Sequence, residues 1–365
     1  MHFLLLILLS QFLALAHGIH MFSMNRIPFI DNLEKVLPHH DVPQQTEKRL
    51  SPVILIPGDG GSRMDAMLDK PDRVHYYCSL QTDMFYDIWL NKELMVWGVI
   101  DCLVDNLRLV YNNITRKTEN APGVTIRIPG WGYSETVEWI DTSHASVSAY
   151  YVNLANTLVM NGYHRGISIR GAPYDFRKAP NENFMFPIKM KMLVEEAYQI
   201  NGKTPVTLIA HSMGGPMVLN FLHQQSQRWK DKYIRRLISL AGAWGGSIKS
   251  MKVYAMGDNL NSDFVSNAAI RALEITTPSL AWLMPSPLVF KPQTVLARTN
   301  TRSYTMEDLE DFFHDIDCPE CWEMHKDVLP YMLNFVKEYA GNDHMGILAN
   351  LTVLDDIAVL QLQDL

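Results

Sequence analysis

Short runs of apolar residues recur along the chain with the length and composition of buried β-strands. The first is Val53–Ile56, which is apolar throughout and stops at Pro57 and Gly58, as expected for a strand that is covered on both faces of a parallel sheet. Comparable runs follow at 124–128, 206–210 and 237–240. Helix-length segments, such as 147–160 and 188–200, lie between them. Strands that alternate with helices form βαβ units, so the pattern predicts an α/β fold with a mostly parallel, doubly wound sheet.

The N-terminal residues have the pattern of a secretion signal. Apolar residues fill most of 3–16, and the stretch ends in an Ala-x-Ala site at Ala16, which predicts a signal peptide over residues 1–16. Residues 17–50 contain scattered prolines and are predicted to form an extended lead-in. The main domain is then expected over 51–365.

Two further observations agree with a secretory route. No later apolar segment has the length of a membrane span. Asn113 and Asn350 each begin an Asn-x-Thr triplet and are candidate glycosylation sites. We therefore expect the mature protein in lysosomes or outside the cell, where disulfides persist.

Composition narrows the class of protein further. Of the 365 residues, 47% are hydrophobic and 19% are charged, which excludes a mainly disordered chain. The net charge is −7 and no long basic block occurs, so a nucleic-acid partner is not expected. Four cysteines are too few for a disulfide scaffold or a multi-zinc protein. A globular enzyme or ligand carrier remains, and we expect a monomer without a metal or organic cofactor.

The segment around Ser212 carries the strongest chemical signal. Ala210 stands two residues before this serine and Gly214 two residues after it, between a predicted strand and a predicted helix. Such a tight strand-to-helix turn leaves no room for larger side chains and exposes the serine oxygen at the helix N-terminus. The pattern predicts a nucleophile elbow with Ser212 as the nucleophile.

A serine nucleophile also needs a base and N–H donors for the oxyanion. One donor would be the backbone N–H of Met213, and the glycine-rich turn 57–61 after the first strand would supply the second. In this topology the base follows the serine along the chain. The candidates are His223, His314, His325 and His344. His344 is preferred because it lies in a polar loop before the final helix pattern.

Several segments outside the elbow resemble the lecithin:cholesterol acyltransferase family, which includes lysosomal (group XV) phospholipase A2. The similarity runs from about residue 51 to about 324 and resumes near the C-terminus. It is carried by 57–59, 69–71, 88–91, 106–112, 170–177, 229–234 and 244–246. The resemblance implies an α/β-hydrolase fold with a membrane-binding cap at about 65–110 and a lid at about 244–275.

The resemblance also implies roles at the site. Ser212 corresponds to the family nucleophile, Asp59 and Met213 to the oxyanion residues, and His344 to the base. The implied activity is that of a phospholipase A and acyltransferase, which cleaves phosphoglyceride acyl esters and passes the acyl group to water or a lipid alcohol. Aspartate at position 59 is typical of the phospholipase branch. Its ionised form would repel a developing oxyanion, so we expect an acidic activity optimum.

The cap loop is expected to contact a phospholipid membrane. By resemblance, Cys78 and Cys102 form the disulfide that closes this loop. Apolar side chains within it suit insertion among lipid chains or contact with substrate. These are Trp89, Leu90, Leu94, Met95, Val96 and Trp97.

The chain departs from the family where the catalytic acid is expected. The Gly-Asp-Gly-type turn that carries this acid does not occur between 322 and 341, and the late strands are expected to be shortened. Nearby carboxylates are Asp315, Asp317, Asp327 and Asp343. Three interpretations remain open: an abbreviated chain, a substitute acid, or a catalytically impaired lipid-binding relative. Cys318 and Cys321 border this region as a disulfide or as free thiols, and their spacing does not favour zinc.

Overall fold

The computed structural model describes residues 49–96, 98–259 and 265–337. The chain divides into two units, Met1–Lys48 and Arg49–Leu365, and all described residues belong to the second. The predicted signal peptide and lead-in, together with Trp97, His344 and Asn350, lie outside the described residues. Among the residues that are described, no helix has the length and apolar character needed to cross a membrane.

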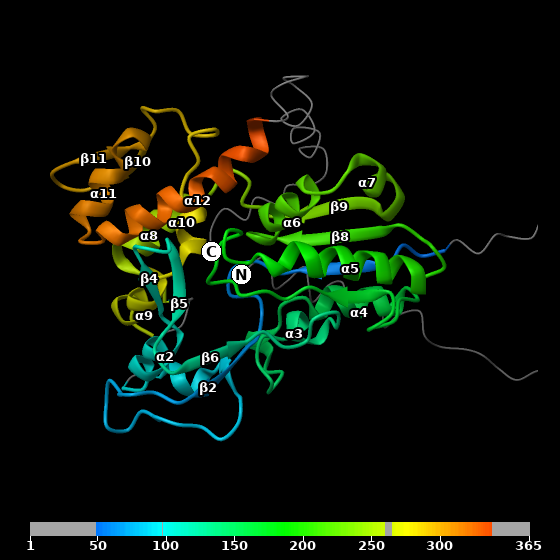
Figure 1. The fold of residues 1–365 in the computed structure, drawn as a ribbon, viewed down its shortest axis with the longest axis horizontal. Coiled ribbons are helices and arrows are strands. Elements are labelled where there is room, and N and C mark those ends of the chain that lie inside the picture. Colours follow the sequence, from blue (N-terminus) through cyan, green and yellow to red (C-terminus); the bar gives the residue numbers. More distant parts are fainter. Residues whose placement is uncertain (1–48, 97, 260–264, 338–365) are drawn as a thin grey trace, which may run out of the picture. The chain divides into compact units, whose positions relative to one another are not determined.

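A four-stranded parallel sheet forms the centre of the described unit. Its order is β7 (Ile169–Gly171), β1 (Val53–Ile56), β8 (Val206–His211) and β9 (Ile234–Leu240). Strand β1 pairs in parallel with β7 on one side and β8 on the other. Figure 1 shows β1, β8 and β9 side by side with helices along the sheet. The predicted α/β fold with a parallel sheet is confirmed.

Helices cover both faces of this sheet. Alternate residues of β1 point to opposite sides, because side chains along a strand have a period of two. Val53 and Leu55 pack with the side of the sheet that carries α3 (Glu135–Glu138) and α4 (Val152–Met160). Ile54 and Ile56 belong to the larger core, which includes α5 (Met185–Ile200) and α6 (Gly214–His223). The run 53–56 is therefore apolar throughout because neither face meets water.

One predicted strand belongs to a different sheet. Residues 124–128 were expected in the parallel sheet, but β6 (Val124–Arg127) pairs antiparallel with β2 (Met64–Leu68), which also pairs with β3 (Tyr86–Trp89). The reason is visible in β6 itself, where Thr125 and Arg127 are exposed. Alternating apolar and polar residues are typical of a half-exposed antiparallel strand.

Two predicted helices have different starting points in the structure. Helix α5 begins at Met185, three residues before the predicted start, and buries a stripe that includes Phe186, Met190 and Leu193 at helical spacing. Helix α4 begins at Val152 rather than at 147, because a 3-10 turn at Ser146–Ser148 comes first. The predicted helix 147–160 is therefore helical over Val152–Met160.

The remaining helices and strands complete the described part of the chain. They are η1 (Lys92–Met95), α2 (Ile100–Leu107), β4 (Leu109–Asn112), β5 (Lys117–Asn120), α7 (Gln227–Tyr233), α8 (Ile248–Met256), α9 (Asn267–Glu274), α10 (Pro278–Trp282), β10 (Val295–Arg298), β11 (Ser303–Thr305), η3 (Met306–Asp308), α11 (Leu309–Asp315) and α12 (Pro319–Lys337). Helix α12 packs against α10, and α2 packs against α9. Among the described strands, β9 lies at the edge of the parallel sheet.

Both cysteine pairs are disulfides. Cys78 and Cys102 are joined with their Cα atoms 5.5 Å apart, which confirms the pairing that the resemblance implies. The bond ties the segment before β3 to helix α2. Cys318 and Cys321 are also joined, at the start of α12, so the free-thiol alternative is wrong.

A buried guanidinium holds three segments together. Arg177 is only 1% exposed and forms two hydrogen bonds with the carboxylate of Asp175, at 2.9 and 2.6 Å. Its other N–H groups donate to the Leu107 carbonyl and to Asn120 Oδ1, both at 2.9 Å. The end of α2, strand β5 and the segment after β7 are therefore joined through one side chain.

We expect Arg177→Met to lower the free energy of unfolding by about 3–5 kcal/mol, because it leaves Asp175 and two other polar groups without their partner. The matched control is Arg127→Met, which removes a guanidinium that is more than half exposed and pairs with Asp65. That loss should be at most about 1 kcal/mol. Urea unfolding of both variants measures the difference, and equal losses would contradict this role of Arg177.

Candidate active site

Ser212 sits on the strained turn that the sequence predicts. It follows β8 directly and lies two residues before α6, and its φ angle is +50°, a value that costs energy for any residue except glycine. The surrounding backbone holds this conformation. The Ser212 N–H donates to the Leu240 carbonyl at 2.9 Å, and the Ser212 carbonyl accepts from Gly215 at 3.0 Å and Ala243 at 3.2 Å.

The loop that follows β1 touches this turn backbone to backbone. A Cβ atom added to Gly58 would lie 2.7 Å from Ser212 Cβ and 3.0 Å from the His211 carbonyl oxygen. A Cβ atom added to Gly214 would lie 2.5 Å from the Pro57 carbonyl oxygen. These distances exclude any side chain at either position, so the glycines predicted from the sequence are required by contact between the two loops.

A cavity of about 500 Å³ opens beside Ser212. Its size is in the range of small-molecule and lipid-chain sites. Asp59 and Gly60 of the loop after β1 line it together with Ser212. About half of the remaining lining residues are apolar, and α8, α9 and α10 each contribute to the wall. The apolar lining residues are Trp89, Leu107, Phe176, Ala241, Ala243, Val253, Ile270, Leu273, Leu280 and Leu283.

Three carboxyl groups and one lysine interrupt this apolar wall. Asp59, Asp258, Glu274 and Lys249 all line the cavity. Lys249 Nζ lies 2.8 Å from an Asp258 carboxylate oxygen, and the Asp258 N–H donates to Glu274 at 3.1 Å. None of Asp258, Glu274 and Lys249 was identified from the sequence. They follow Ser212 by several dozen residues, and only the fold brings them to the cavity.

The cavity changes the acidity of its carboxyl groups. Asp59 is exposed to solvent, but many protein atoms surround its carboxyl group, and desolvation raises its pKa to about 6 although Lys249 acts in the opposite direction. Desolvation also raises the pKa of Glu274 to about 8. Asp59 is therefore mostly neutral below pH 6 and ionised above it, while Glu274 stays neutral up to about pH 8.

None of the three histidine candidates among the described residues lines this cavity. His344 is outside the described residues, so its role stays a prediction. His223, His314 and His325 are absent from the cavity wall. His325 is fully enclosed on α12, and its Nδ1 lies 2.9 Å from the Ala281 carbonyl oxygen, which indicates a structural role.

Two of the aspartates weighed as substitute acids are bound elsewhere. Asp327 accepts hydrogen bonds from Tyr111 at 2.6 Å and from Arg116 at 2.8 Å. Asp315 accepts from Tyr304 at 2.7 Å. Neither lines the cavity that contains Ser212.

The disulfide-closed segment presents a different apolar surface from the predicted one. Trp89 and Met95 were predicted to contact substrate or membrane, but they are only 6% and 7% exposed and present no surface to a membrane in this structure. Trp89 instead lines the cavity, and its Nε1 donates to the Gly60 carbonyl at 2.8 Å. Leu90 and Leu94 are half-buried, and Val96 is exposed.

Residues that the sequence analysis passed over are more exposed. Tyr76 and Met84 are 84% and 77% exposed, and Val74 and Tyr77 are also on the surface. They lie before and just after Cys78, where no continuous apolar run draws attention to them. A single exposed tyrosine or methionine has no periodic signal, so only the structure identifies this surface.

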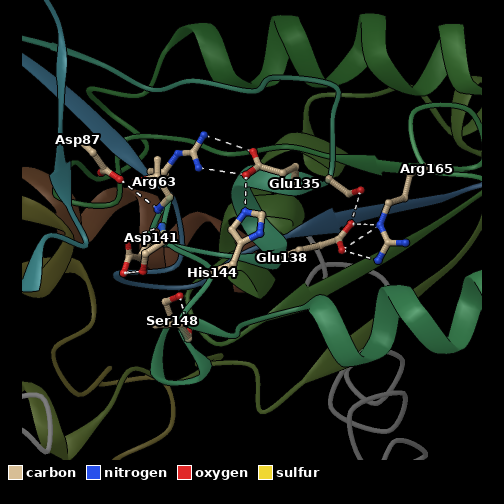
Figure 2. A network of polar contacts seen from close by, with 12 residues as sticks. Arg63, Asp87, Glu135, Glu138, Asp141, His144, Ser148 and Arg165 are labelled. Atoms are coloured by element: carbon tan, nitrogen blue, oxygen red, sulfur yellow. Dashed lines mark hydrogen bonds and ion pairs between the residues drawn. The ribbon is translucent and has the colours of Figure 1, made fainter.

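A polar network fixes the segment that leads into Tyr150 (Figure 2). Glu135 accepts from Arg63 at 3.1 Å and lies 3.2 Å from His144. Glu138, which is buried on α3, binds Arg165 with contacts of 2.6 to 3.0 Å. Glu135 and Glu138 are both engaged in ion pairs, so these contacts hold the backbone of this segment in place.

Comparison with known proteins points to the same family as the resemblance in the sequence. The family model described as lecithin:cholesterol acyltransferase matches residues 84–352. The chain is 44% identical over 276 residues to the bovine lysosomal phospholipase A and acyltransferase, covering 76% of this chain and 68% of that protein. The human protein of that name is also 44% identical, over 279 residues with the same coverage.

Mouse phosphatidylcholine-sterol acyltransferase is 42% identical over 293 residues, covering 80% of this chain and 66% of that protein. A solved chain titled as the Tle4–Tli4 complex matches with a TM-score of 0.38 and 13% identity, over 78% of this chain and 71% of that one, which is too weak to add to the assignment. The extent and identity of the sequence matches show that the chain belongs to the lecithin:cholesterol acyltransferase family.

Proposed function

We propose that this chain is a serine-dependent phospholipase A and acyltransferase. The observation that carries the proposal is Ser212 on a strained strand-to-helix turn, at the wall of an apolar cavity of about 500 Å³. A cavity of this kind suits a fatty acyl chain. The relatives named as lysosomal phospholipase A and acyltransferase support the same reaction class.

The proposed chemistry uses a covalent acyl-enzyme. His344 accepts the Ser212 hydroxyl proton while the serine oxygen attacks the acyl carbonyl of a phosphoglyceride. The N–H groups of Asp59 and Met213 stabilise the oxyanion. Collapse of the tetrahedral intermediate expels the lysolipid alkoxide, which takes the proton back from His344. Water or a lipid alcohol then attacks the acyl-enzyme by the same steps in reverse order.

The surrounding segments suit an α/β-hydrolase fold with two additions. We place the membrane-binding cap around the disulfide-closed segment, with Tyr76, Met84 and Val96 as lipid contacts because they are exposed and apolar. The segment from about 244 to 275 contributes α8 and α9 to the cavity wall and would act as the lid. Relatives named as lysosomal, an exposed Asn113 and the predicted signal peptide support a secretory-pathway location.

The alternative is a lipid-binding relative that does not turn over. Its motivation is the catalytic acid, since Asp315 and Asp327 are engaged outside the cavity. The comparisons favour the enzyme, because the relatives reported above are named as acyltransferases.

Labelling with a fluorophosphonate separates the two possibilities. We expect the folded wild-type chain to be phosphonylated and Ser212→Ala to remain unlabelled, because the probe reacts with an activated serine oxygen. Mass spectrometry of the labelled peptide identifies the site. A folded wild-type chain that takes up no label would favour the lipid-binding alternative.

The activity of the wild-type chain should fall as pH rises through about 6. Asp59 loses its proton there, and its negative charge opposes the oxyanion. One pH unit above the pKa about a tenth of the carboxyl groups remain neutral, so the loss is about tenfold per unit. Asp59→Asn cannot ionise and should move the falling limb of the pH–rate profile upward.

The rising limb, which reports the base, should not move in this variant. Initial rates with a soluble ester between pH 4 and 8 provide the profile, and the range spans the pKa of about 6. An Asp59→Asn profile that superimposes on the wild-type profile would show that this carboxyl does not set the optimum.

The exposed surface near Cys78 can be tested separately from catalysis. Tyr76→Ser combined with Met84→Ser should weaken binding to phosphatidylcholine liposomes by at least about tenfold, since complete burial of a large apolar side chain is worth roughly 1.5–3 kcal/mol and even partial burial of two exceeds about 1.4 kcal/mol. Hydrolysis of a soluble ester should not change.

Ile114→Ser is the matched control for this experiment, because Ile114 is 93% exposed on the loop between β4 and β5. Liposome sedimentation measures binding. Equal weakening by the control would argue against a localised membrane surface.

A further inference from the structure

Two tyrosine hydroxyls hold the peptide bond between Pro57 and Gly58 from opposite ends. The Gly58 N–H donates to Tyr150 Oη at 3.0 Å. The Pro57 carbonyl accepts from Tyr174 Oη at 3.0 Å. A peptide unit is planar, so two hydrogen bonds at its two ends fix the orientation of the whole unit.

The proton of Tyr150 connects this peptide to the nucleophile turn. Tyr150 Oη also contacts His211 Nδ1 within hydrogen-bond reach. Since the oxygen accepts from Gly58, its own hydrogen is available for the imidazole nitrogen. Burial lowers the pKa of His211 and so favours the neutral ring, and in the tautomer that carries its proton on Nε2 the Nδ1 atom accepts. A chain of hydrogen bonds therefore runs from Gly58 through Tyr150 to the residue directly before Ser212.

A further bond fixes the next peptide, which carries the Asp59 N–H. The Gly58 carbonyl accepts from the Gly61 N–H at 3.2 Å, which closes a turn. In a trans peptide the carbonyl and the following N–H point in opposite directions, so this bond also sets the direction of the Asp59 N–H. Asp59 lines the cavity beside Ser212. Its N–H is thus aimed by bonds on the residues before and after it.

The Tyr150 ring has little freedom to move. It packs edge-on against Tyr151 with ring centres 4.9 Å apart and against His211 at 5.4 Å. A Cβ atom on Gly61 would lie 2.8 Å from Tyr150 Cζ, so the loop backbone closes over the ring. Pre-organised groups stabilise charge in a transition state without a reorganisation cost, which gives this rigidity a catalytic use.

We infer that Tyr150 is a positioning residue for the oxyanion: with Tyr174, its hydroxyl orients the Pro57–Gly58 peptide so that the following N–H, that of Asp59, faces the reacting acyl oxygen. The inference rests on the proposed function. Tyr150 acts through the backbone and needs no contact with the substrate, so its loss should impair the transition state and leave substrate binding intact.

The test compares two tyrosine-to-phenylalanine variants. Tyr150→Phe should lower kcat on a soluble ester roughly 10- to 100-fold, because a displaced oxyanion donor costs up to this much. KM should stay within about twofold of wild type. Phosphonylation by a fluorophosphonate should slow in parallel, since that reaction also builds negative charge on an oxygen in the same place.

Tyr254→Phe is the matched control. Tyr254 is fully buried, and its hydroxyl has no hydrogen-bond partner among the described residues. The control removes the same atom from a tyrosine without breaking a bond to the loop, and kcat should not change. If Tyr150→Phe lowers kcat no more than Tyr254→Phe, or raises KM alone, the inference is overturned.

Variants at His211 check the second bond of Tyr150. His211→Asn keeps an acceptor close to the position of Nδ1 and should retain most of the activity, whereas His211→Leu should resemble Tyr150→Phe. The double variant Tyr150→Phe/His211→Leu should be no worse than the poorer single variant, because both remove one chain of bonds. Additive losses would contradict a shared pathway.

Hydrogen exchange distinguishes failure of this inference from failure of the proposed function. If the wild-type chain neither hydrolyses esters nor takes up the fluorophosphonate label, the proposed function fails. The hydrogen bond from the Gly58 N–H to Tyr150 still predicts slow exchange of that amide. Exchange of the peptide spanning 56–62 should accelerate in Tyr150→Phe and not in Tyr254→Phe. If exchange of this peptide is unchanged in Tyr150→Phe, the positioning role of Tyr150 is overturned, whether or not the variant is active.

Discussion

The close backbone contact between two loops is the constraint on which the candidate site depends. Strands β1 and β8 are parallel neighbours with Ile56 opposite Ala210, so their carboxyl ends meet at one edge of the sheet. The loops that leave them touch at Gly58 and Gly214, where no Cβ atom fits. The register of the two strands therefore determines how near the loop 57–61 comes to Ser212. This distance in turn places Asp59 and Gly60 in the same cavity wall as Ser212.

The parts of this arrangement that the sequence predicts are those with a local signal. Val53–Ile56 is apolar throughout because both faces are buried, and the small residues around Ser212 are required within a few positions of it. Strand β7 has only three residues and no such signal, and β6 alternates in a way that suits another sheet. Pairing partners depend on distant segments, which local patterns do not specify.

The charged groups of the cavity likewise depend on distant segments and have no local signal in the sequence. Glu274 lies on α9 and reaches the cavity only because α8, α9 and α10 fold over it. A carboxyl group in an apolar wall is neutral while the pH is below its raised pKa, as for Asp59 below about 6. Neutralisation of Asp59 therefore removes one charge from the wall, while the ion pair between Lys249 and Asp258 remains there. The polarity of the cavity thus depends on pH because desolvation raises these pKa values, and composition does not reveal desolvation.

Trp89 shows how the apolar surface and the reacting centre are joined. Its ring packs in the core against Phe176 with centres 5.3 Å apart, while its Nε1 holds the Gly60 carbonyl at 2.8 Å. Strand β3 carries this side chain and begins eight residues after Cys78, near the exposed Tyr76 and Met84. A displacement of β3 would break the bond to Gly60 and release one end of the loop that contains Asp59. The segment proposed to meet the lipid is therefore connected through β3 to the loop that contains Asp59, and the buried Trp89 makes that connection.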